Sequence, residues 1–165
     1  MTAKSVIIRK ARSDDISTVS DIIRESYRDV ADRFGLTPEN CPKHPSNCTD
    51  AWITRDRGRG VVFYMLERGG TPIGCAALEK ADADLCYLER LAVRPEHRRS
   101  GFGTALSRHV LAQAAASGAV RVSIGIIAAQ TELKRWYRQM GFSEGETRTF
   151  DHLPFQVTFM MCSLG

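Results

Sequence analysis

The sequence lacks the features typical of membrane, disulfide-rich secreted and disordered proteins. Its longest apolar run, residues 61–66, is far shorter than the ~20 residues that a membrane-spanning helix requires, so no membrane association is expected. The first residues show neither the apolar stretch nor the cleavage site of a signal peptide, which predicts a cytoplasmic location. The five scattered cysteines are odd in number and favour reduced thiols over a disulfide framework.

A large charge excess is also missing. The 23 basic and 19 acidic residues leave a net charge of +4, which is too small to indicate nucleic-acid binding but suits attraction of a phosphate-bearing small molecule. An RNA-binding domain is disfavoured further because no strand interleaves arginine and aromatic side chains on one face. A chain of 165 residues, 43% of them hydrophobic, predicts one globular domain over residues 1–165.

Hydrophobic periodicity predicts an α+β fold. The expected strands are residues 6–11, 61–68, 71–80, 85–93, 120–127, 142–148 and 155–162. The expected helices are one that Ser13 caps and that continues through Tyr27 to Val30, then residues 50–57, residues 102–118 and residues 133–140. Three strands follow one another in the middle of the chain, which favours a mixed sheet over a doubly wound one.

The most informative segment is residues 88–104, which predicts a strand, a basic loop with two glycines and the start of a helix. Glycine lets a backbone approach a ligand closely, and the first N–H groups of a helix have no internal partners. Together with the helix dipole, these groups form an anion site, and Arg94, Arg98 and Arg99 lie beside it in sequence. We therefore expect a phosphate or pyrophosphate here; a tight turn with solvated arginines is the alternative.

Two motifs then indicate a family. The pattern Arg98-x-x-Gly101-x-Gly103, after residues 91–93 and Pro95, resembles the acetyl-CoA signature of the GNAT superfamily of acyl-CoA-dependent N-acyltransferases. Residues 136–142, Trp-Tyr-Arg-Gln-Met-Gly-Phe, resemble the second motif of that superfamily, and the order of elements is similar across nearly the whole chain.

This resemblance implies a fold and a co-substrate. The implied fold is a mixed, mostly antiparallel central sheet of six to seven strands, flanked by about four helices, with a V-shaped splay between the fourth and fifth strands. Acetyl-CoA is the implied co-substrate, and no metal is implied. Backbone groups of Leu91 and Val93 would bind the pantetheine arm, backbone N–H groups of residues 99–104 would hold the pyrophosphate, and Gln130 stands where the superfamily usually has asparagine. The implied cofactor-binding residues are Leu91, Val93, Arg98, Arg99, Ser100, Gly101, Phe102, Gly103, Thr104 and Gln130.

Two residues are candidates for acid–base chemistry. The resemblance implies that Tyr137 is the general acid for the leaving thiolate, although its place on the apolar face with Leu133 also fits a core residue. Glu89 is the candidate base, because strand alternation places it on one face with Leu91 and Val93, where burial would raise the pKa of its carboxyl. An ion pair with a neighbouring arginine is the alternative role for Glu89.

The implied activity is N-acetylation of a primary amine by direct transfer in a ternary complex. A small-molecule acceptor is expected, since no long charged groove is evident; a protein N-terminus or lysine remains open, and a non-catalytic acyl-CoA sensor is the alternative from another class. The segment between the first helix and the second strand is expected to line the acceptor side. The candidate substrate residues are Tyr27, Phe34, His44 and Trp52.

Three further features receive no catalytic role. Cys41, His44 and Cys48 have a spacing similar to metal ligands, but no further Cys/His pair lies nearby to complete a site, so no metal is predicted. Either cysteine would allow an acyl-cysteine route, with nothing in the sequence to place it near the cofactor. The apolar residues 155–162 could pair across a homodimer.

Overall fold

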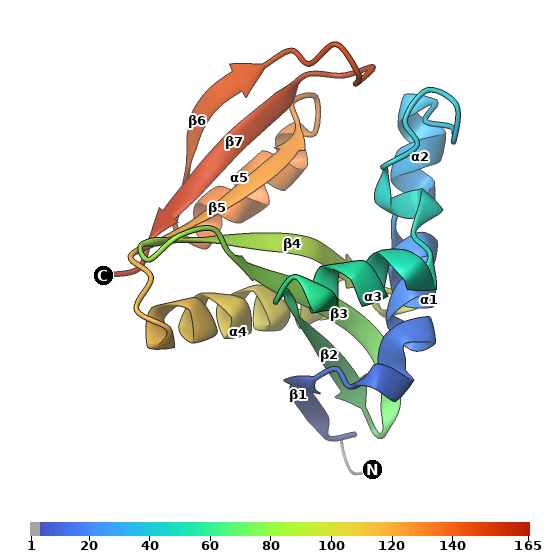
Figure 1. Ribbon diagram of the computed structural model, residues 1–165, viewed down its shortest axis with the longest axis vertical. Helices are drawn as coiled ribbons and strands as arrows, with labels where there is room; N and C mark the ends of the chain where they lie inside the picture. Colours follow the sequence, from blue (N-terminus) through green and yellow to red (C-terminus); the bar gives the residue numbers. More distant parts are fainter. Residues whose placement is uncertain (1–3) are drawn as a thin grey trace.

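A seven-stranded mixed sheet forms the centre of the structure, a computed structural model that describes residues 4–165 (Figure 1). The strands are β1 (Val6–Lys10), β2 (Val62–Arg68), β3 (Thr71–Lys80), β4 (Leu85–Val93), β5 (Arg121–Ile127), β6 (Phe142–Arg148) and β7 (Val157–Ser163). Their order across the sheet is β1-β2-β3-β4-β5-β7-β6, and every neighbouring pair is antiparallel except β4 and β5.

The parallel pair β4 and β5 stays together only briefly. Pairing runs from Leu85 opposite Arg121 to Tyr87 opposite Ser123, and beyond that point the strands separate toward the right of Figure 1. Beyond that point no strand within residues 4–165 pairs with the open edge of β4, and the Leu91 carbonyl accepts a hydrogen bond from the Tyr27 hydroxyl instead. The predicted α+β class and the splay between the fourth and fifth strands are confirmed.

Helices cover the sheet from two sides. The helices α1 (Ile16–Ser26), α2 (Arg28–Phe34) and α3 (Asp50–Gly58) lie on one side, and α4 (Phe102–Ala116) packs on the opposite face of β3 and β4 (Figure 1). The remaining helix, α5 (Thr131–Gln139), packs against β6. Gly74 lets α4 approach the sheet closely, since a Cβ there would lie 3.0 Å from Leu106 Cδ1. Among residues 4–165, no helix is long and apolar enough to cross a bilayer.

Two apolar clusters correspond to these two sides. Beneath α4 and α5, the first cluster includes Leu66, Leu106 and Tyr137. Between the sheet and α1 and α3, the second includes Ile23 and Phe63. The strands β2 and β3 therefore contribute alternate side chains to two different cores.

The expected single helix through residues 16–30 is wrong. The chain leaves the α conformation at Tyr27, whose φ of −98° and ψ of 3° separate α1 from α2. Ser13 caps no α-helix either: it begins a 3₁₀ turn (Ser13–Asp15) in which the Asp15 carboxylate accepts the Arg12 N–H at 2.8 Å. Apolar spacing is continuous across the break, and for this reason the periodicity gave no sign of it.

A β-bulge in β4 changes which side chains share a face. Glu89 lies opposite Ala77 and Ala92 lies opposite Cys75, so Arg90 and Leu91 together oppose one residue of β3. Arg90 has a φ of 49°, in the left-handed region. The bulge reverses the alternation of the strand.

Consequently Glu89 faces the α1 and α3 side with Ala77, while Leu91 and Val93 pack into the cluster beneath α4. The expectation that Glu89 shares a face with Leu91 and Val93 is wrong, because regular alternation does not hold through the bulge.

Candidate active site

A pocket of about 520 Å³ lies beside the N-terminus of α4, where β4 has separated from β5. The predicted cofactor-binding residues line this pocket, with the exception of Ser100, which lies between two of them in the loop. We call it the cofactor-side pocket. Leu91 and Val93 form one wall of the pocket. Gln130 also lines it and lies immediately before the start of α5.

The glycine loop has the backbone geometry of an anion site. Arg99 has a φ of 62° and Gly101 a φ of 82°, so the chain turns sharply before α4 begins at Phe102. Gly101 is the N-cap residue and supplies no side chain to the first N–H groups of α4. Residues 101–104 line the cofactor-side pocket, so the uncapped start of α4 and the positive end of its dipole lie beside this pocket, which suits a pyrophosphate.

Arg98 has partners within the protein. Its Nη1 lies 2.7 Å from Asp29 Oδ2, and its Nη2 donates to the Ser26 carbonyl. The guanidinium therefore connects α1 and α2 to the loop while also lining the cofactor-side pocket. Its positive charge is shared with Asp29, so the backbone N–H groups are the more direct binding groups for an anion.

A second pocket, of about 500 Å³, adjoins the first, and we call it the acceptor-side pocket. Both volumes fall within the range of small-molecule sites. The residues that line both pockets are Tyr27, Val30, Leu91, Gln130, Leu133 and Tyr137. The two pockets thus meet at a shared wall, and α5 and the α1–α2 break contribute to opposite sides of that junction.

Tyr137 lies at this junction with its ring held firmly. The side chain is buried, and its ring makes edge contacts with Trp136 at 4.9 Å and Phe142 at 5.3 Å between centroids. None of the hydrogen bonds within residues 4–165 uses its hydroxyl. Burial raises the pKa of Tyr137 well above its usual range, so the hydroxyl keeps its proton at neutral pH.

Tyr27 and His44 form the wall opposite Tyr137. The Tyr27 hydroxyl donates to the Leu91 carbonyl at 2.8 Å, and the His44 ring meets the Tyr27 ring edge-on at 5.8 Å. His44 Nδ1 lies 2.7 Å from Ser46 Oγ. Burial, with a smaller contribution from Arg28, lowers the pKa of His44 to about 4, so its imidazole is neutral at neutral pH.

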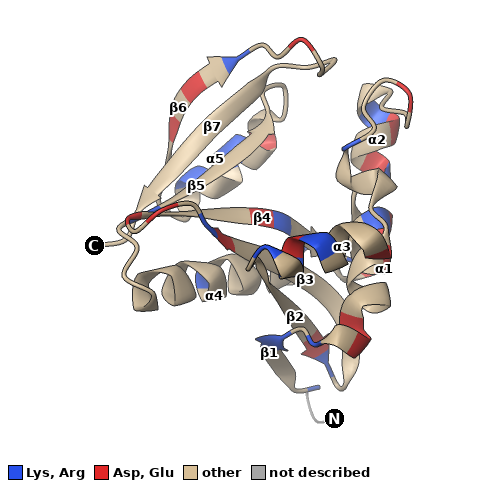
Figure 2. Cartoon of the chain, in the orientation of Figure 1, with Lys and Arg blue, Asp and Glu red and all other residues tan. Residues whose placement is uncertain are grey.

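Charged side chains from β3, β4 and α3 gather on the floor of the acceptor-side pocket, where Figure 2 shows acidic and basic stretches of β4 beside those of α3. The Arg59 Nη1 atom lies 2.7 Å from Glu79 Oε1, and its Nη2 atom lies 3.0 Å from Asp56 Oδ1. Arg90 reaches Asp56 from β4 at 3.5 Å. Asp56 itself is almost fully buried and so depends on these guanidinium groups for its charge balance.

Glu89 lies in the same cluster and titrates abnormally. Burial, followed by the hydrogen-bonded carboxyl of Glu79, raises the pKa of Glu89 to about 8. The hydrogen bond with Glu89 lowers the pKa of Glu79, and the Arg59 guanidinium lowers it further. The pair therefore holds one proton near neutral pH and can release it in the pH range where an amine is deprotonated.

Residues 18–142, more than half of the chain, match the acetyltransferase (GNAT) family. The chain belongs to this family. The resemblance inferred from its two motifs is confirmed.

Individual relatives of this GNAT protein are also named as acetyltransferases. It is 34% identical over 150 residues to an amino-acid acetyltransferase of Neisseria meningitidis; the match covers 90% of the chain but 29% of that relative, so the chain spans less than a third of its length. It is 36% identical over 119 residues to an uncharacterized N-acetyltransferase of Mycobacterium tuberculosis, covering 68% and 76% of the two chains. A putative acetyltransferase of Salmonella typhimurium, solved with its cofactor acetyl-CoA, has the same fold, with a TM-score of 0.72 at 18% identity over 97% and 94% of the chains.

The four candidate substrate residues of this GNAT protein lie in different places. Tyr27 and His44 line the acceptor-side pocket. Phe34, the last residue of α2, packs against a small apolar cluster that includes Leu36 and Ile127, outside both pockets. Trp52 lies behind the pocket wall, with its ring 5.3 Å from the Arg90 Cζ atom.

The cysteines have no contact with either pocket. Cys41 and Cys48 are buried free thiols, and burial raises the pKa of Cys48 to about 11, which disfavours the nucleophilic thiolate. Cys41 has a raised pKa for the same reason. Within the part of the chain that the structure describes, no group of three or more His, Cys, Asp or Glu side chains could hold a metal ion.

The sequence analysis missed Asp56, Arg59 and Glu79. Asp56 and Arg59 belong to a short segment of mostly polar residues, where nothing distinguishes a buried carboxylate from a solvated one. A signal for Glu79 was present: the short turn between the strands 71–80 and 85–93 pairs their near ends. This pairing places Glu79 next to Tyr87 and diagonal to Glu89.

Proposed function

We propose that this GNAT protein transfers an acetyl group from acetyl-CoA directly to the primary amine of a small molecule in a ternary complex, with residues 1–165 acting as one catalytic domain. The observation that carries this is the shared wall of the two pockets at Leu91 and Tyr137. A donor in one pocket and an acceptor in the other meet there without a covalent enzyme intermediate.

The chain offers a fitting place for the donor. The uncapped start of α4 suits the pyrophosphate, and the backbone of Leu91 and Val93, beyond the last residues of β4 that pair with β5, suits the pantetheine amides. When bound, acetyl-CoA supplies a thioester carbonyl that an amine can attack. Tyr137 keeps its proton at neutral pH, and its hydroxyl is available to protonate the departing thiolate.

Glu89 is the proposed base. It lines the acceptor-side pocket and is absent from the lining of the cofactor-side pocket, which is the distribution expected of a group that serves the amine. Its raised pKa makes it a strong enough base to accept the amine proton, and Glu79 shares that proton. His44 also lines the pocket, but with a pKa of about 4 it is a much weaker base.

A small acceptor is favoured by the size of the acceptor-side pocket and by the relative named amino-acid acetyltransferase. The test is a thiol-release assay with acetyl-CoA and a panel of free amino acids, simple amines and peptides, with acetylated products identified by mass spectrometry. We expect turnover with small amines. Transfer to peptide N-termini or lysines alone would overturn the small-molecule acceptor, and tight acetyl-CoA binding without turnover would identify a sensor.

A further inference from the structure

Arg90 occupies an unusual place in the acceptor-side pocket. The bulge in β4 gives it a φ of 49° and turns its side chain to the same face as that of Glu89. In a regular strand, neighbouring side chains point to opposite faces. The bulge therefore brings a carboxyl group and a guanidinium group to adjacent positions of the same pocket wall.

The protein satisfies the Arg90 guanidinium only in part. Its ion pair with Asp56 is 3.5 Å long, whereas Asp56 has a shorter pair with Arg59 at 3.0 Å. The Arg90 Nε atom is buried and has no hydrogen-bond partner within residues 4–165. The side chain is 17% exposed, so solvent compensates little of this charge.

The pocket as a whole carries an excess of positive charge. Arg55, Arg59 and Arg90 line it, against the carboxylates of Asp56 and Glu79. Glu89 is the remaining acidic side chain of the lining, and its raised pKa leaves it mostly protonated at neutral pH. While Glu89 is protonated, three guanidinium groups thus meet two carboxylates, and Arg59 lies closer to both carboxylates than Arg90 does.

We propose that Arg90 binds a carboxylate of the acceptor, so that the acceptors of this enzyme are primary amines that carry a carboxylate, such as free α-amino acids. This inference rests on the proposed function. A guanidinium binds a carboxylate through two parallel hydrogen bonds, and the Trp52 ring behind Arg90 holds its plane in place. Since Glu89 lies next to Arg90 on the same face, an amine and a carboxylate of one small acceptor can reach both.

The first experiment varies the acceptor and leaves the protein unchanged. Each amino acid in the panel is compared with its α-amide and with the amine that lacks the carboxyl group. We expect kcat/KM to fall about 10- to 100-fold on loss of the carboxylate, the effect of one or two charge-assisted hydrogen bonds. A peptide with a free N-terminus and an acidic side chain tests whether a carboxylate attached to a larger molecule is accepted instead.

The second experiment varies the arginine. Arg90→Gln should raise KM for the carboxylate-bearing acceptor by about the same factor and abolish the preference over the amide, while acetyl-CoA binding stays unchanged. Arg90→Lys keeps the charge without the planar fork and should retain part of the preference. The matched control is Arg9→Gln on β1, since Arg9 is similarly shielded at 25% exposure but lines neither pocket.

The outcomes separate this inference from the proposed function. Equal kcat/KM for amino acids and their amides with the unaltered enzyme would overturn the role of Arg90 and leave the acetyltransferase intact. Binding of acetyl-CoA without transfer to any amine in the panel would overturn the proposed function itself. If Arg90→Gln does not fold, the comparison of acceptors with the unaltered enzyme decides alone.

Discussion

The hydroxyl of Tyr27 donates a 2.8 Å hydrogen bond to the carbonyl of Leu91, which joins the break between α1 and α2 to β4 at the wall where the two pockets meet. The backbone N–H of Tyr27 completes the last turn of α1 by donating to the Ile23 carbonyl. The same residue thus ends one helix and fixes the backbone on which the pantetheine arm is expected to bind. The geometry of the helical side and that of the strand are coupled through this bond.

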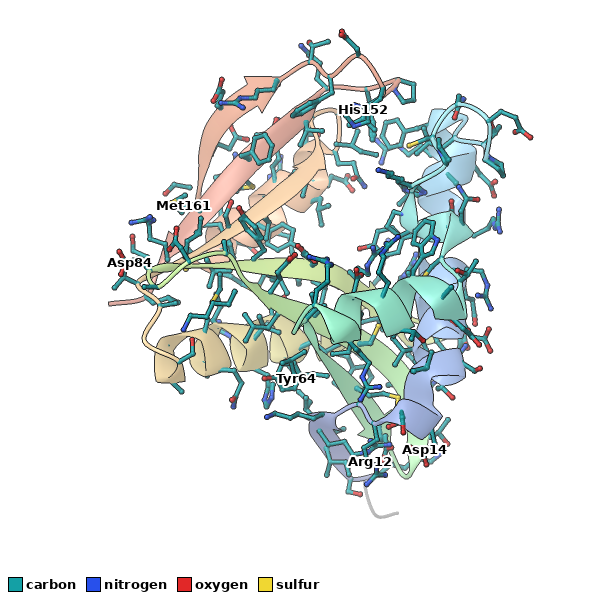
Figure 3. The ribbon with its side chains drawn as sticks, viewed as in Figure 1. Arg12, Asp14, Tyr64, Asp84, His152 and Met161 are labelled. Atoms are coloured by element: carbon teal, nitrogen blue, oxygen red, sulfur yellow. The ribbon has the colours of Figure 1, made fainter. Side chains whose placement is uncertain are left out.

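Tyr27→Phe tests this coupling. Loss of the bond should lower the free energy of unfolding by about 1 kcal/mol and weaken acetyl-CoA binding, because the Leu91 backbone loses its anchor. Thermal unfolding and calorimetric titration measure the two effects. Tyr64→Phe is the control: this buried tyrosine of β2 lies near α4, away from both pockets, and its hydroxyl makes no hydrogen bond within the described residues (Figure 3). Similar results for the two variants would contradict the role of the Tyr27 bond.

Gly101→Val should abolish measurable acetyl-CoA binding. A β-branched residue is strained at a φ of 82°, so the loop would shift its N–H groups away from the pyrophosphate. The matched control is Gly118→Val, at a φ of 95° just beyond the other end of α4, which carries similar strain but lines neither pocket. Both variants should melt earlier than the parent, but Gly118→Val should keep its affinity for acetyl-CoA. Parental affinity in Gly101→Val would refute the proposed anion site.

Tyr137→Phe should reduce kcat by about 10²- to 10⁴-fold, the usual contribution of a general acid, because the phenyl ring keeps the packing and loses only the proton. The dissociation constant for acetyl-CoA should change little. Tyr87→Phe, a partly exposed tyrosine outside both pockets, should leave kcat unchanged. Rates from single-turnover acetyl transfer check this, and a Tyr137→Phe enzyme with full activity would remove the tyrosine from the chemistry.

Glu79→Gln should move the pH dependence of kcat/KM to lower pH. Glu89 acts as a base only when ionised, and with a pKa near 8 its ionised fraction, and hence the rate, increases as the pH rises through about 8. Removing the negative charge of Glu79 makes ionisation of Glu89 easier, so the pKa of Glu89 falls and the rate increases at lower pH. Glu89→Gln should eliminate this part of the profile.

The control for this profile is Glu144→Gln, since Glu144 pairs with Arg138 outside both pockets. One acceptor is used throughout, so that the ionisation of its own amine is common to all enzymes. An unchanged profile in Glu79→Gln would show that the two carboxyl groups do not share a proton during catalysis.

The glycine loop, the Trp136-Tyr137 helix and the order of strands could be predicted because each depends on local residue types. The backbone conformation of the loop requires a glycine at position 101, and runs of apolar residues indicate the strands. The break at Tyr27 could not be predicted in this way, since the apolar spacing continues across it and the Tyr27 hydroxyl bonds to a carbonyl 64 residues away. Asp56 was missed for a similar reason: its burial comes from contacts with β4, whereas its own helix is polar.

The bulge at Arg90 makes the site depend on the number of residues in β4 as well as on their identities. Deleting Arg90 would remove the bulge and leave Glu89 opposite Ala77 and Ala92 opposite Cys75, so the pocket wall would keep the carboxyl group and lose the guanidinium group beside it. The bulge thus adds one side chain to the lining of the acceptor-side pocket without changing the pairing of the residues on either side of it.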